Sequence, residues 1–589
     1  MEWPPFDLQH HLEEHLTRVG RENCGFGEEF SAQVQLAPAR FGDFQANGAL
    51  AQGKRSQIPP RQLAQRWLEA VRGEEMFSPT RYELQVAGGG FLNIALSGQA
   101  MVEWLAAHGD GDALRRSARE LDGRTCVVDF SSPNSAKQMH VGHLRSLVLG
   151  DAICRILEFF GARVIRDNHI GDWGTQFGIL LRQMAREGVT LEEMEPEEGL
   201  KLLEGLYRRG FREVEESEEA LREAREELVA LQGGDRARLA LWERINAISL
   251  AAFQQIYDLC SVHFDLVRGE SCYRDSLDRV FRELLDCAIA EEDGGALAVF
   301  HRDHGRFCTQ PFLIRKSDGA SNYASSDLAT VLYRVERLGA DAILYAVDAR
   351  QQDHFQQLFL TVERWFARMG YRLPELRHIS FGTICGEDGR AIRTRSGEPI
   401  PLRQLFSEAI ARALAIVEKK NPGLDGESRR RIARAVGVGA IKYGDLCQNR
   451  TSDYAFSWDR MLSFDGNTAP YLLYALARLH AIARHAPREL SNEAGEAISP
   501  IRDGEERALA RKLLHFPTTL HQVLADFRPH LLCTYLYELA GEFSSFYAAC
   551  RVIGPDRDES RRRLFLCSRT RTFLQLGLEL LGLETLEQM

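Results

Sequence analysis

TCVVDFSSPNSAKQMHVGH, residues 125–143, joins an apolar strand to a helix through a polar loop. TCVVDF (125–130) is a short apolar run typical of a buried strand, and from His140 apolar residues recur at helical spacing until Gly161. ARVIRDNHI (162–170) then has the pattern of a second strand. A strand, a helix and a strand in this order predict a βαβ unit with parallel strands and a right-handed crossover.

A second strand-to-helix junction lies further along the chain. AILYAV (342–347) precedes DARQQDHFQQLFLTVERWF (348–366), and strand patterns also occur in GALAVF (295–300) and PFLIRK (311–316). Two such units predict one doubly wound α/β sheet. Residues 180–262 are helical and heavily charged, which indicates a solvated helical insertion laced with i,i+4 ion pairs rather than part of an active site.

The two ends of the chain have different patterns. Residues 1–115 mix amphipathic helices with two strands around a glycine turn and predict a small α+β domain. From about residue 400 the pattern is nearly all helical. We therefore predict four parts: an α+β domain (1–115), an α/β domain (116–400) with its insertion near 180–262, a helical connecting region (401–465), and an all-α bundle (466–589).

Composition is that of an ordinary soluble protein. The 589 residues are 44% hydrophobic and 27% charged, which excludes a disordered or fibrous chain. No run approaches the roughly 18 apolar residues of a membrane span, and the N-terminal segment lacks the features of a secretory signal, so a cytoplasmic location is expected. The net charge is −11, and only eight of the 73 basic residues are lysine. This preference for arginine suggests GC-rich coding and a bacterial source.

The first candidate site is His140-Val141-Gly142-His143. A helix N-terminus that follows a strand binds anions, because free N–H groups and the positive end of the helix dipole point outward. Two imidazoles there can donate to phosphate oxygens, Gly142 leaves space for a flat nucleotide, and Lys137 adds a point charge. Two alternatives stay open: a zinc site with His169 as third ligand, and a merely solvated Lys137.

Two loops are further candidates for nucleotide binding. NHIGDWGTQFG (168–178) follows the second strand, and its Gly171, Asp172 and Gly174 suggest a ligand-shaped loop, although an ordinary turn has the same composition. GEDGRAIRTRSGEPIPL (386–402) carries several arginines between Gly and Ser, which suits a triphosphate or a solvated turn equally.

Acidic and polar residues at strand ends form the third candidate. Asp129 ends the first strand and Asn134 follows it, while Tyr323 and Asp327 have the spacing that places them on one helical face. Gln351, together with Asp348 and Arg350, follows AILYAV. If these strand ends converge, carboxylates surround a pocket that suits the forked geometry of a guanidinium. Each residue alone can also be a cap or a surface acid.

Taken together, the motifs resemble a known family. DFSSPN (129–134), AK (136–137), MHVGHLRS (139–146), NHIGDWGTQFG, the segment 323–330 and DARQ (348–351) are similar to arginyl-tRNA synthetases, which are class I aminoacyl-tRNA synthetases. FGDFQANGAL (41–50) and residues 443–479 also resemble this family. The similarity runs from about residue 35 to the C-terminus.

The resemblance implies a class I Rossmann-type α/β catalytic domain with a small N-terminal α+β domain and an all-α anticodon-binding bundle. It implies ATP-dependent ligation of L-arginine to its tRNA through arginyl-adenylate, with release of AMP and pyrophosphate. The residues that match the family's site are Lys137, His140, His143 and Arg395 for catalysis; His140, Gly142, His143, Gly171, Asp172, Gly174 and Arg393 for ATP; and Asp129, Ser132, Asn134, Tyr323, Asp327 and Gln351 for arginine.

The resemblance also implies the partners. Mg²⁺ is expected to arrive with ATP, without a dedicated protein site, and the chain is expected to act as a monomer. In this family adenylate formation generally needs bound tRNA, whose elbow would contact residues 1–115 and whose anticodon would contact the C-terminal bundle. The rivals are a class I synthetase for another amino acid and a catalytically silent paralogue that only binds tRNA or a protein partner.

The sequence departs from the family pattern at two points. The KMSKS loop of class I enzymes is absent and IRTRS (392–396) stands in its place, so Lys137 is expected to substitute for the missing lysine. Asp129 stands where Glu is frequent, and its shorter side chain implies contact with arginine through water.

Overall fold

The computed structural model describes residues 3–191, 194–317, 322–386, 388–390, 392, 399–490 and 497–589. The chain forms two compact units, of which one comprises residues 121–461 and the other comprises residues 1–120 and 462–589. Within the described residues, no helix is both long enough and apolar enough to cross a membrane. The division into four parts stays a prediction.

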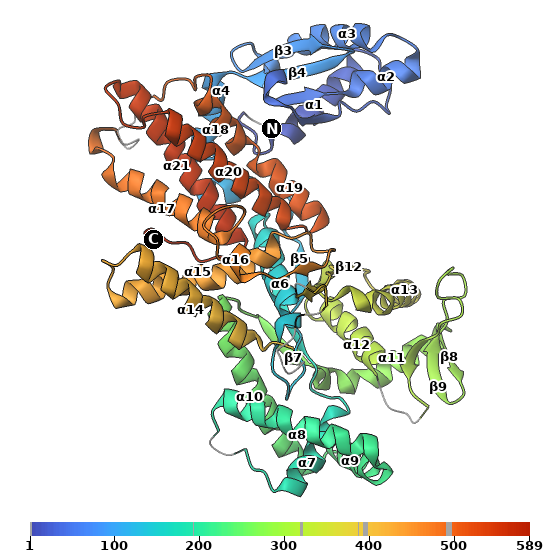
Figure 1. Cartoon of the computed structure of the whole chain (residues 1–589). Helices are drawn as coiled ribbons and strands as arrows, with labels where there is room; N and C mark the ends of the chain where they lie inside the picture. The colour runs from blue at the N-terminus through green and yellow to red at the C-terminus, as the bar shows by residue number, and fades with distance from the viewer. Residues whose placement is uncertain are drawn as a thin grey trace. The chain divides into compact units, whose positions relative to one another are not determined.

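A five-stranded parallel sheet forms the centre of the unit 121–461 (Figure 1). The strands are β5 (Thr125–Asp129), β6 (Arg163–Ile170), β7 (Leu266–Gly269), β11 (Ala342–Tyr345) and β12 (Glu375–His378). Their order, β12-β11-β5-β6-β7, reverses direction between β5 and β11, as in a Rossmann fold. Ligands of such sheets bind outside the carboxyl ends of the strands at this reversal, where Asp129 and Tyr345 are paired in register.

Helices cover this sheet. The first crossover passes through the short turn η3 (Val141–His143) and α6 (Leu144–Phe159), which contacts β5, β6 and α15 (Gly426–Leu446). A hydrophobic core forms where apolar side chains of β5, β6 and β11 pack against three helices, which lie together in Figure 1. These are α11 (Arg274–Asp286), α12 (Tyr323–Glu336) and α13 (Gln352–Met369).

The remaining elements of this unit lie outside the parallel sheet. The insertion consists of α7 (Gln176–Glu187), α8 (Pro196–Glu216), α9 (Glu218–Gln232) and α10 (Arg236–Cys260). GALAVF and PFLIRK belong to a small antiparallel sheet of β8 (Ala290–Asp293), β9 (Ala296–Val299) and β10 (Phe312–Arg315), separate from the main sheet. The other elements are α14 (Leu402–Lys420), α16 (Trp458–Met461), and the parallel pair β13 (Ile384–Cys385) and β14 (Tyr454–Ala455).

The second unit combines both ends of the chain. Its N-terminal part contains α1 (Leu8–Glu22), β1 (Val34–Leu36), β2 (Phe44–Ala46), α2 (Gly48–Ser56), α3 (Pro60–Arg72), β3 (Tyr82–Ala87), β4 (Phe91–Leu96), α4 (Gly98–Ala107) and α5 (Gly111–Ser117). The four strands form one antiparallel sheet in the order β1-β2-β4-β3. The buried carboxylate of Asp43 joins this sheet to the helical part, since it accepts a hydrogen bond of 2.9 Å from Arg507.

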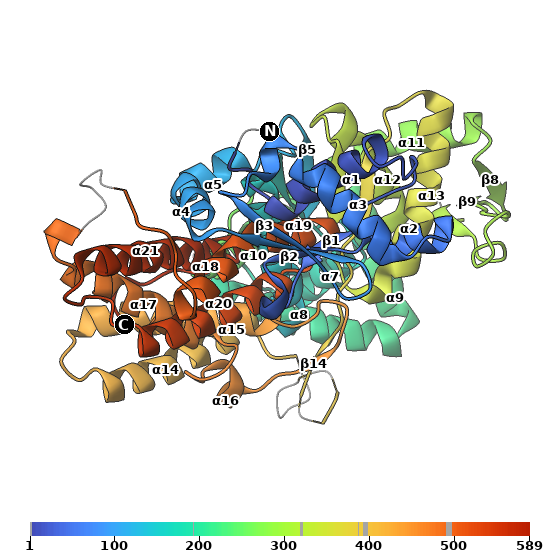
Figure 2. The same cartoon turned by 90° about the horizontal axis from the view of Figure 1, so that it is seen from above.

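The helical part of this unit agrees with the all-α bundle predicted for residues 466–589. Its helices are α17 (Ala469–His485), α18 (Glu505–Leu514), α19 (Phe516–Asp526), α20 (His530–Ala549) and α21 (Arg557–Leu580). Helices α17, α20 and α21 contact one another and run side by side in Figure 2.

A fully buried arginine joins α12 to the sheet. The Nη2 atom of Arg334 lies 2.6 Å from Oδ2 of Asp129 and 2.8 Å from Oδ2 of Asp167. Asp129 and Asp167 are paired in register on β5 and β6, and the guanidinium lies over the ring of Tyr345 on β11, with its central carbon 5.3 Å from the ring centroid. One side chain therefore connects three neighbouring strands at the carboxyl edge of the sheet.

We expect Arg334→Met to lower the free energy of unfolding by about 3–5 kcal/mol, because two buried carboxylates lose their shared partner. Urea denaturation followed by circular dichroism measures this loss. Arg337→Met, on the exposed end of the same helix, is the matched control and should change stability by less than about 0.5 kcal/mol. Equal losses in the two variants would contradict the role of the buried ion pair.

Candidate active site

The two histidines of the HVGH motif form a paired cap at the start of α6. The backbone N–H of His140 donates to Nδ1 of His143 (3.1 Å), and the N–H of Gly142 donates to Nδ1 of His140 (3.1 Å). A Cβ atom at position 142 would lie 2.8 Å from Cε1 of His140, so glycine allows this ring to fold back over the turn. Because Nδ1 of His140 accepts a hydrogen bond from Gly142, the proton of the neutral His140 ring lies on Nε2. Nδ1 of His143 also lies 3.3 Å from the carbonyl oxygen of His140.

Burial keeps both rings neutral. It lowers the pKa of His143 to about 3, with a further contribution from the nearby His140. Burial also lowers the pKa of His140, an effect that Glu204 opposes and that Lys137 and Arg350 reinforce. At pH 7 each ring is therefore neutral and carries one N–H donor, which can stabilise the negative charge of a phosphate.

A cavity of about 440 Å³ opens beside this pair. Its walls come from the loop after β5, from the histidine turn, from α8 and from the segment before α14. The lining residues are Pro133, Asn134, Lys137, Gln138, His140, His143, Glu204, Tyr207, Arg208 and Pro399. The prediction that the insertion takes no part in a site is therefore wrong, because three of its residues line the cavity. The sequence could have indicated this, because the i, i+3, i+4 spacing of Glu204, Tyr207 and Arg208 places all three side chains on one face of a helix.

The chain returns to the histidines just after the arginine-rich loop. Val141 donates its N–H to the carbonyl of Ile400 (2.9 Å), and Leu402 donates to the carbonyl of Met139 (2.8 Å). The entry to the loop is held by the pairing of β13 with β14. Both ends of the loop are thus anchored in this unit, whereas Arg393, predicted to bind ATP, and Arg395, predicted to act in catalysis, lie outside the described residues.

Two predicted pocket residues, Tyr323 and Asp327, lie close to an acid that was not predicted, Glu270. Tyr323 and Asp327 occupy the first turns of α12, and the turn η4 (Glu270–Tyr273) brings Glu270 close to both. Burial raises the pKa of Glu270 to about 8, and the neighbouring Asp327 and Asp172 add to the rise. Asp327 also contacts Nε2 of His354 at 2.6 Å. Glu270 escaped the sequence analysis, although it directly follows a strand, because β7 is short and carries charge.

Asp129 is already occupied by protein groups. Besides Arg334, its carboxylate accepts a hydrogen bond of 2.8 Å from Oγ of Ser132. Ser132 has a left-handed backbone with φ of 44°, as do Ser131 (71°) and Ala136 (65°). Such backbone conformations are strained in residues other than glycine and cluster at functional sites. The loop therefore holds its predicted residues in a fixed and costly conformation.

The loop after β6 closes against the loop after β5. Gly171 forms a bridge with the exposed Asn134, and a Cβ at position 171 would lie 2.0 Å from the Asn134 side-chain oxygen. Gly174 similarly faces the side chain of Gln176. Glycine is required at position 171 because the two loops approach this closely.

Asp172 and His169 point to partners other than those predicted. The Asp172 carboxylate accepts hydrogen bonds from the backbone N–H (2.9 Å) and hydroxyl (2.7 Å) of Ser271, so it holds the turn that carries Glu270. Burial raises the pKa of Asp172. His169 lies against the ring of Tyr273 at 5.7 Å between centroids. Within the described residues, no group of three or more His, Cys, Asp or Glu side chains is arranged to hold a metal ion.

Gln351 lies on the other side of the sheet reversal. It is exposed at the end of η5 (Ala349–Gln351), next to Arg350, whose guanidinium forms two hydrogen bonds of 2.9 Å with Asp348. The charge of Arg350 lowers the pKa of His140, so this turn lies near the histidine pair. The site thus combines a neutral histidine pair and an acidic pocket at one edge of a Rossmann sheet.

This sheet order and a histidine pair at the first crossover define the class I aminoacyl-tRNA synthetases. The family model "tRNA synthetases class I (R), catalytic domain" matches residues 112–458, the "Arginyl tRNA synthetase N terminal domain" matches residues 7–96, and the "DALR anticodon binding domain" matches residues 472–589. The chain belongs to the arginyl-tRNA synthetase family.

Individual proteins agree with this assignment. An arginine–tRNA ligase of Marinomonas sp. (strain MWYL1) is 44% identical, with 94% of this chain and 95% of the relative covered, and one of Pseudomonas fluorescens (strain Pf0-1) is 41% identical, with 98% and 99% covered. Among solved structures, the arginyl-tRNA synthetase of Plasmodium falciparum has a TM-score of 0.82 at 26% identity and 99% coverage of each chain. That of Thermus thermophilus has a TM-score of 0.79 at 27% identity, with 99% of this chain and 100% of that chain covered.

Two substitutions of His143 separate donation from capping. Gln places an amide N–H where Nε2 lies but loses the Nδ1 acceptor, whereas Asn keeps an acceptor near Nδ1 and loses the donor. We expect His143→Asn to lower the kcat of tRNA aminoacylation by about 100-fold or more, and His143→Gln to retain at least tenfold more activity than Asn. A higher rate for Asn would show that the ring acts mainly as a helix cap.

Proposed function

We propose that the chain ligates L-arginine to its tRNA with ATP at the cavity beside His140 and His143. The observation that carries this proposal is that the histidine turn after β5 and the acid Glu270 after β7 both lie at the carboxyl edge of the same parallel sheet. The arginine carboxylate would attack the α-phosphorus of ATP and release pyrophosphate. A hydroxyl of the terminal adenosine of tRNA would then attack the carbonyl carbon of the adenylate and release AMP.

ATP would bind along the histidine side. The Nε2–H groups of His140 and His143 would donate to phosphate oxygens, and Gly142 would admit the flat part of the nucleotide. Lys137 would supply the point charge that the absent KMSKS lysine supplies in other class I enzymes. We assign Gly171, Gly174, Asp172, Arg393 and Arg395 to the rest of the ATP site, with Asp172 acting through the turn that it holds.

Mg²⁺ would come with the ATP phosphates, because this ion keeps several waters and prefers phosphate oxygens to an all-protein cage. We further propose that the chain acts as a monomer in the cytoplasm.

Arginine would bind on the acidic side. Asp327 and Glu270 offer carboxylates to the guanidinium, whose planar fork matches them, whereas a lysine ammonium would leave part of the pocket unpaired at a cost of about 1–3 kcal/mol per buried group. Tyr323 would close the pocket. Ser132, Asn134 and Gln351 are proposed to hold the amino and carboxyl groups, and Asp129 would act through Ser132 or water, since Arg334 occupies one of its oxygens.

The second unit would bind tRNA, with residues 1–115 at the elbow and the helical part at the anticodon. A pocket of about 500 Å³ between α17 and the end of α20 supports the latter assignment. Its rim carries Arg478, whose guanidinium lies 5.2 Å from the ring centroid of Tyr474 and 5.4 Å from that of Tyr547. Tyr474 is 48% exposed and Tyr547 is 42% exposed. Exposed aromatic rings beside an arginine are suited to stack on unpaired bases.

We expect arginine binding to release a proton. Glu270, with a pKa of about 8, is mainly protonated at pH 7, and a bound guanidinium would lower this pKa and ionise the acid, so close to one proton would leave. Calorimetry in buffers of different ionisation enthalpy measures the number released. Glu270→Gln should abolish the release and weaken arginine binding about 10- to 100-fold.

Asp275→Asn, an exposed acid close by on α11, is the control and should change neither quantity. Arginine binding without proton release in the wild-type protein would remove Glu270 from the pocket.

We expect Tyr547→Ala to raise the KM for tRNA about 5- to 100-fold, because base stacking on an aromatic ring contributes about 1–3 kcal/mol. The KM values for ATP and arginine should stay within twofold. Tyr537→Ala removes a ring of similar exposure from the same helix and serves as control, since Tyr537 does not line this pocket. A similar rise in both variants would argue against base binding in the pocket.

A further inference from the structure

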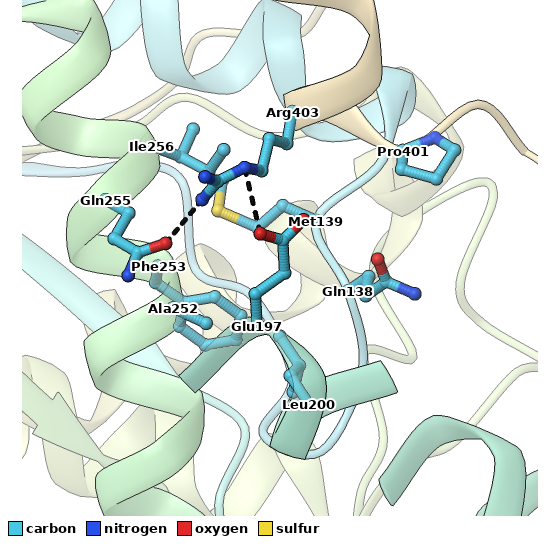
Figure 3. Close-up of a pocket in the computed structure, with 10 residues that line it drawn as sticks. All are labelled: Gln138, Met139, Glu197, Leu200, Ala252, Phe253, Gln255, Ile256, Pro401 and Arg403. Atoms are coloured by element: carbon cyan, nitrogen blue, oxygen red, sulfur yellow. Dashed lines mark hydrogen bonds and ion pairs between the residues drawn. The ribbon is translucent and has the colours of Figure 1, made fainter. Parts of the chain in front are cut away.

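Helix α8 of the insertion is anchored at its first turns against the base of the arginine-rich loop (Figure 3). Leu200 lines a small crevice with Met139 and Phe253, all three of which are buried. Arg403 covers the crevice, because it pairs with Glu197 of α8 at 3.1 Å and donates a hydrogen bond to Gln255 of α10. This contact fixes the start of α8 next to the segment that precedes the histidine turn.

One turn further along, the same helix faces the nucleotide cavity. Glu204 accepts hydrogen bonds of 2.7 Å from Gln138 and from Arg208, so both its oxygens already have donors. The ammonium of Lys137 lies instead over the ring of Tyr207, 4.6 Å from its centroid. The negative face of an aromatic ring attracts a cation at this distance.

The ring of Tyr207 restricts the position of the Lys137 ammonium. A lysine side chain has four rotatable bonds and about 2 kcal/mol of rotamer entropy, so a free ammonium would sample many positions. Burial at the cavity lowers the pKa of Lys137, and the charge of Glu204 opposes this change. A ring face stabilises the charged form and leaves its N–H groups available to a phosphate, whereas a direct carboxylate pair would consume them.

Tyr207 also lies between the two halves of the site. Burial raises its pKa, and the nearby Tyr323 of the acidic pocket contributes to the rise.

We propose that Tyr207 is a positioning residue that holds the Lys137 ammonium over its ring, toward the phosphates of ATP. The proposal rests on the phosphate-binding role of Lys137 given above. Tyr207 therefore acts through another residue, and its removal affects ATP and leaves arginine and tRNA binding in place.

The experiment measures kcat/KM for ATP, and the KM values for arginine and tRNA, in Tyr207→Leu, Tyr207→Phe and Lys137→Met, and in the double variant Lys137→Met with Tyr207→Leu. Tyr207→Leu should lower kcat/KM for ATP about 3- to 30-fold, the range of a partly buried cation–π contact. Tyr207→Phe keeps the ring and should recover most of this loss. In the Lys137→Met background, the Leu substitution should change the value by less than twofold.

Phe211→Leu is the matched control. Phe211 contacts Tyr207 with 5.8 Å between ring centroids, lies on the same helix one turn on, and is 41% exposed. It should stay within twofold of the wild type for all three substrates. If Lys137→Met is too slow to assay, the double-mutant comparison can use the affinity for ATP with Mg²⁺, measured by calorimetry in the same variants.

The outcomes separate the proposal from the function on which it rests. A loss from Tyr207→Leu that is as large in the Lys137→Met background as in the wild type would overturn the proposal, and so would a loss that Tyr207→Phe shares. A rise in the KM for arginine or tRNA equal to the loss for ATP would show a structural role for the ring. An unchanged kcat/KM for ATP in Lys137→Met would instead refute the role of Lys137 itself.

Discussion

The buried ion pair of Arg334 with Asp129 and Asp167 is the constraint on which the site depends. Two carboxylates lie side by side on neighbouring strands inside the protein, and without a cation their mutual repulsion and desolvation would oppose the sheet. Arg334 comes from the last turns of α12, and Tyr323 and Asp327 come from its first turns. The same contact that neutralises the strand ends therefore sets the distance between the acidic pocket and the histidine pair.

This arrangement has a consequence for specificity. Asp129 was predicted to bind the guanidinium of the substrate arginine. In the structure it binds the guanidinium of Arg334 instead. The acid Glu270 lies in the acidic pocket, and its raised pKa reflects burial and the neighbouring carboxylates of Asp327 and Asp172. The histidines show the converse, since burial keeps them uncharged. Glu270 and the histidine pair thus carry little charge of their own, which limits the cost of desolvating these groups.

Sequence patterns were sufficient for the parts of the chain where local chemistry and fold agree. Two strand-to-helix junctions predicted the Rossmann sheet, and apolar spacing predicted the helix that starts at HVGH, because period and capping are local properties. The partners of Asp129 and the acid Glu270 were not predictable in this way. In the sequence, nothing distinguishes Arg334 from other charged residues on helices. The strand β7 is too short to be recognised from the sequence, so Glu270 could not be identified as a residue at the end of a strand. Their roles depend on tertiary proximity, which one sequence does not contain.

The insertion shows how a charged helix can serve two purposes. Most of its ion pairs, such as Arg222 with Glu226 at 2.8 Å, are exposed and contribute little to stability. On α8, however, Glu204, Tyr207 and Arg208 share one face, and the apolar anchor at Leu200 turns that face toward the cavity. Because the anchor also contacts the base of the loop at Arg403, a shift of α8 would change both the position of Lys137 and the exit of the arginine-rich loop. The cavity beside the histidine pair is therefore assembled from elements far apart in the sequence, and its geometry depends on an insertion whose composition alone indicates only a solvated surface.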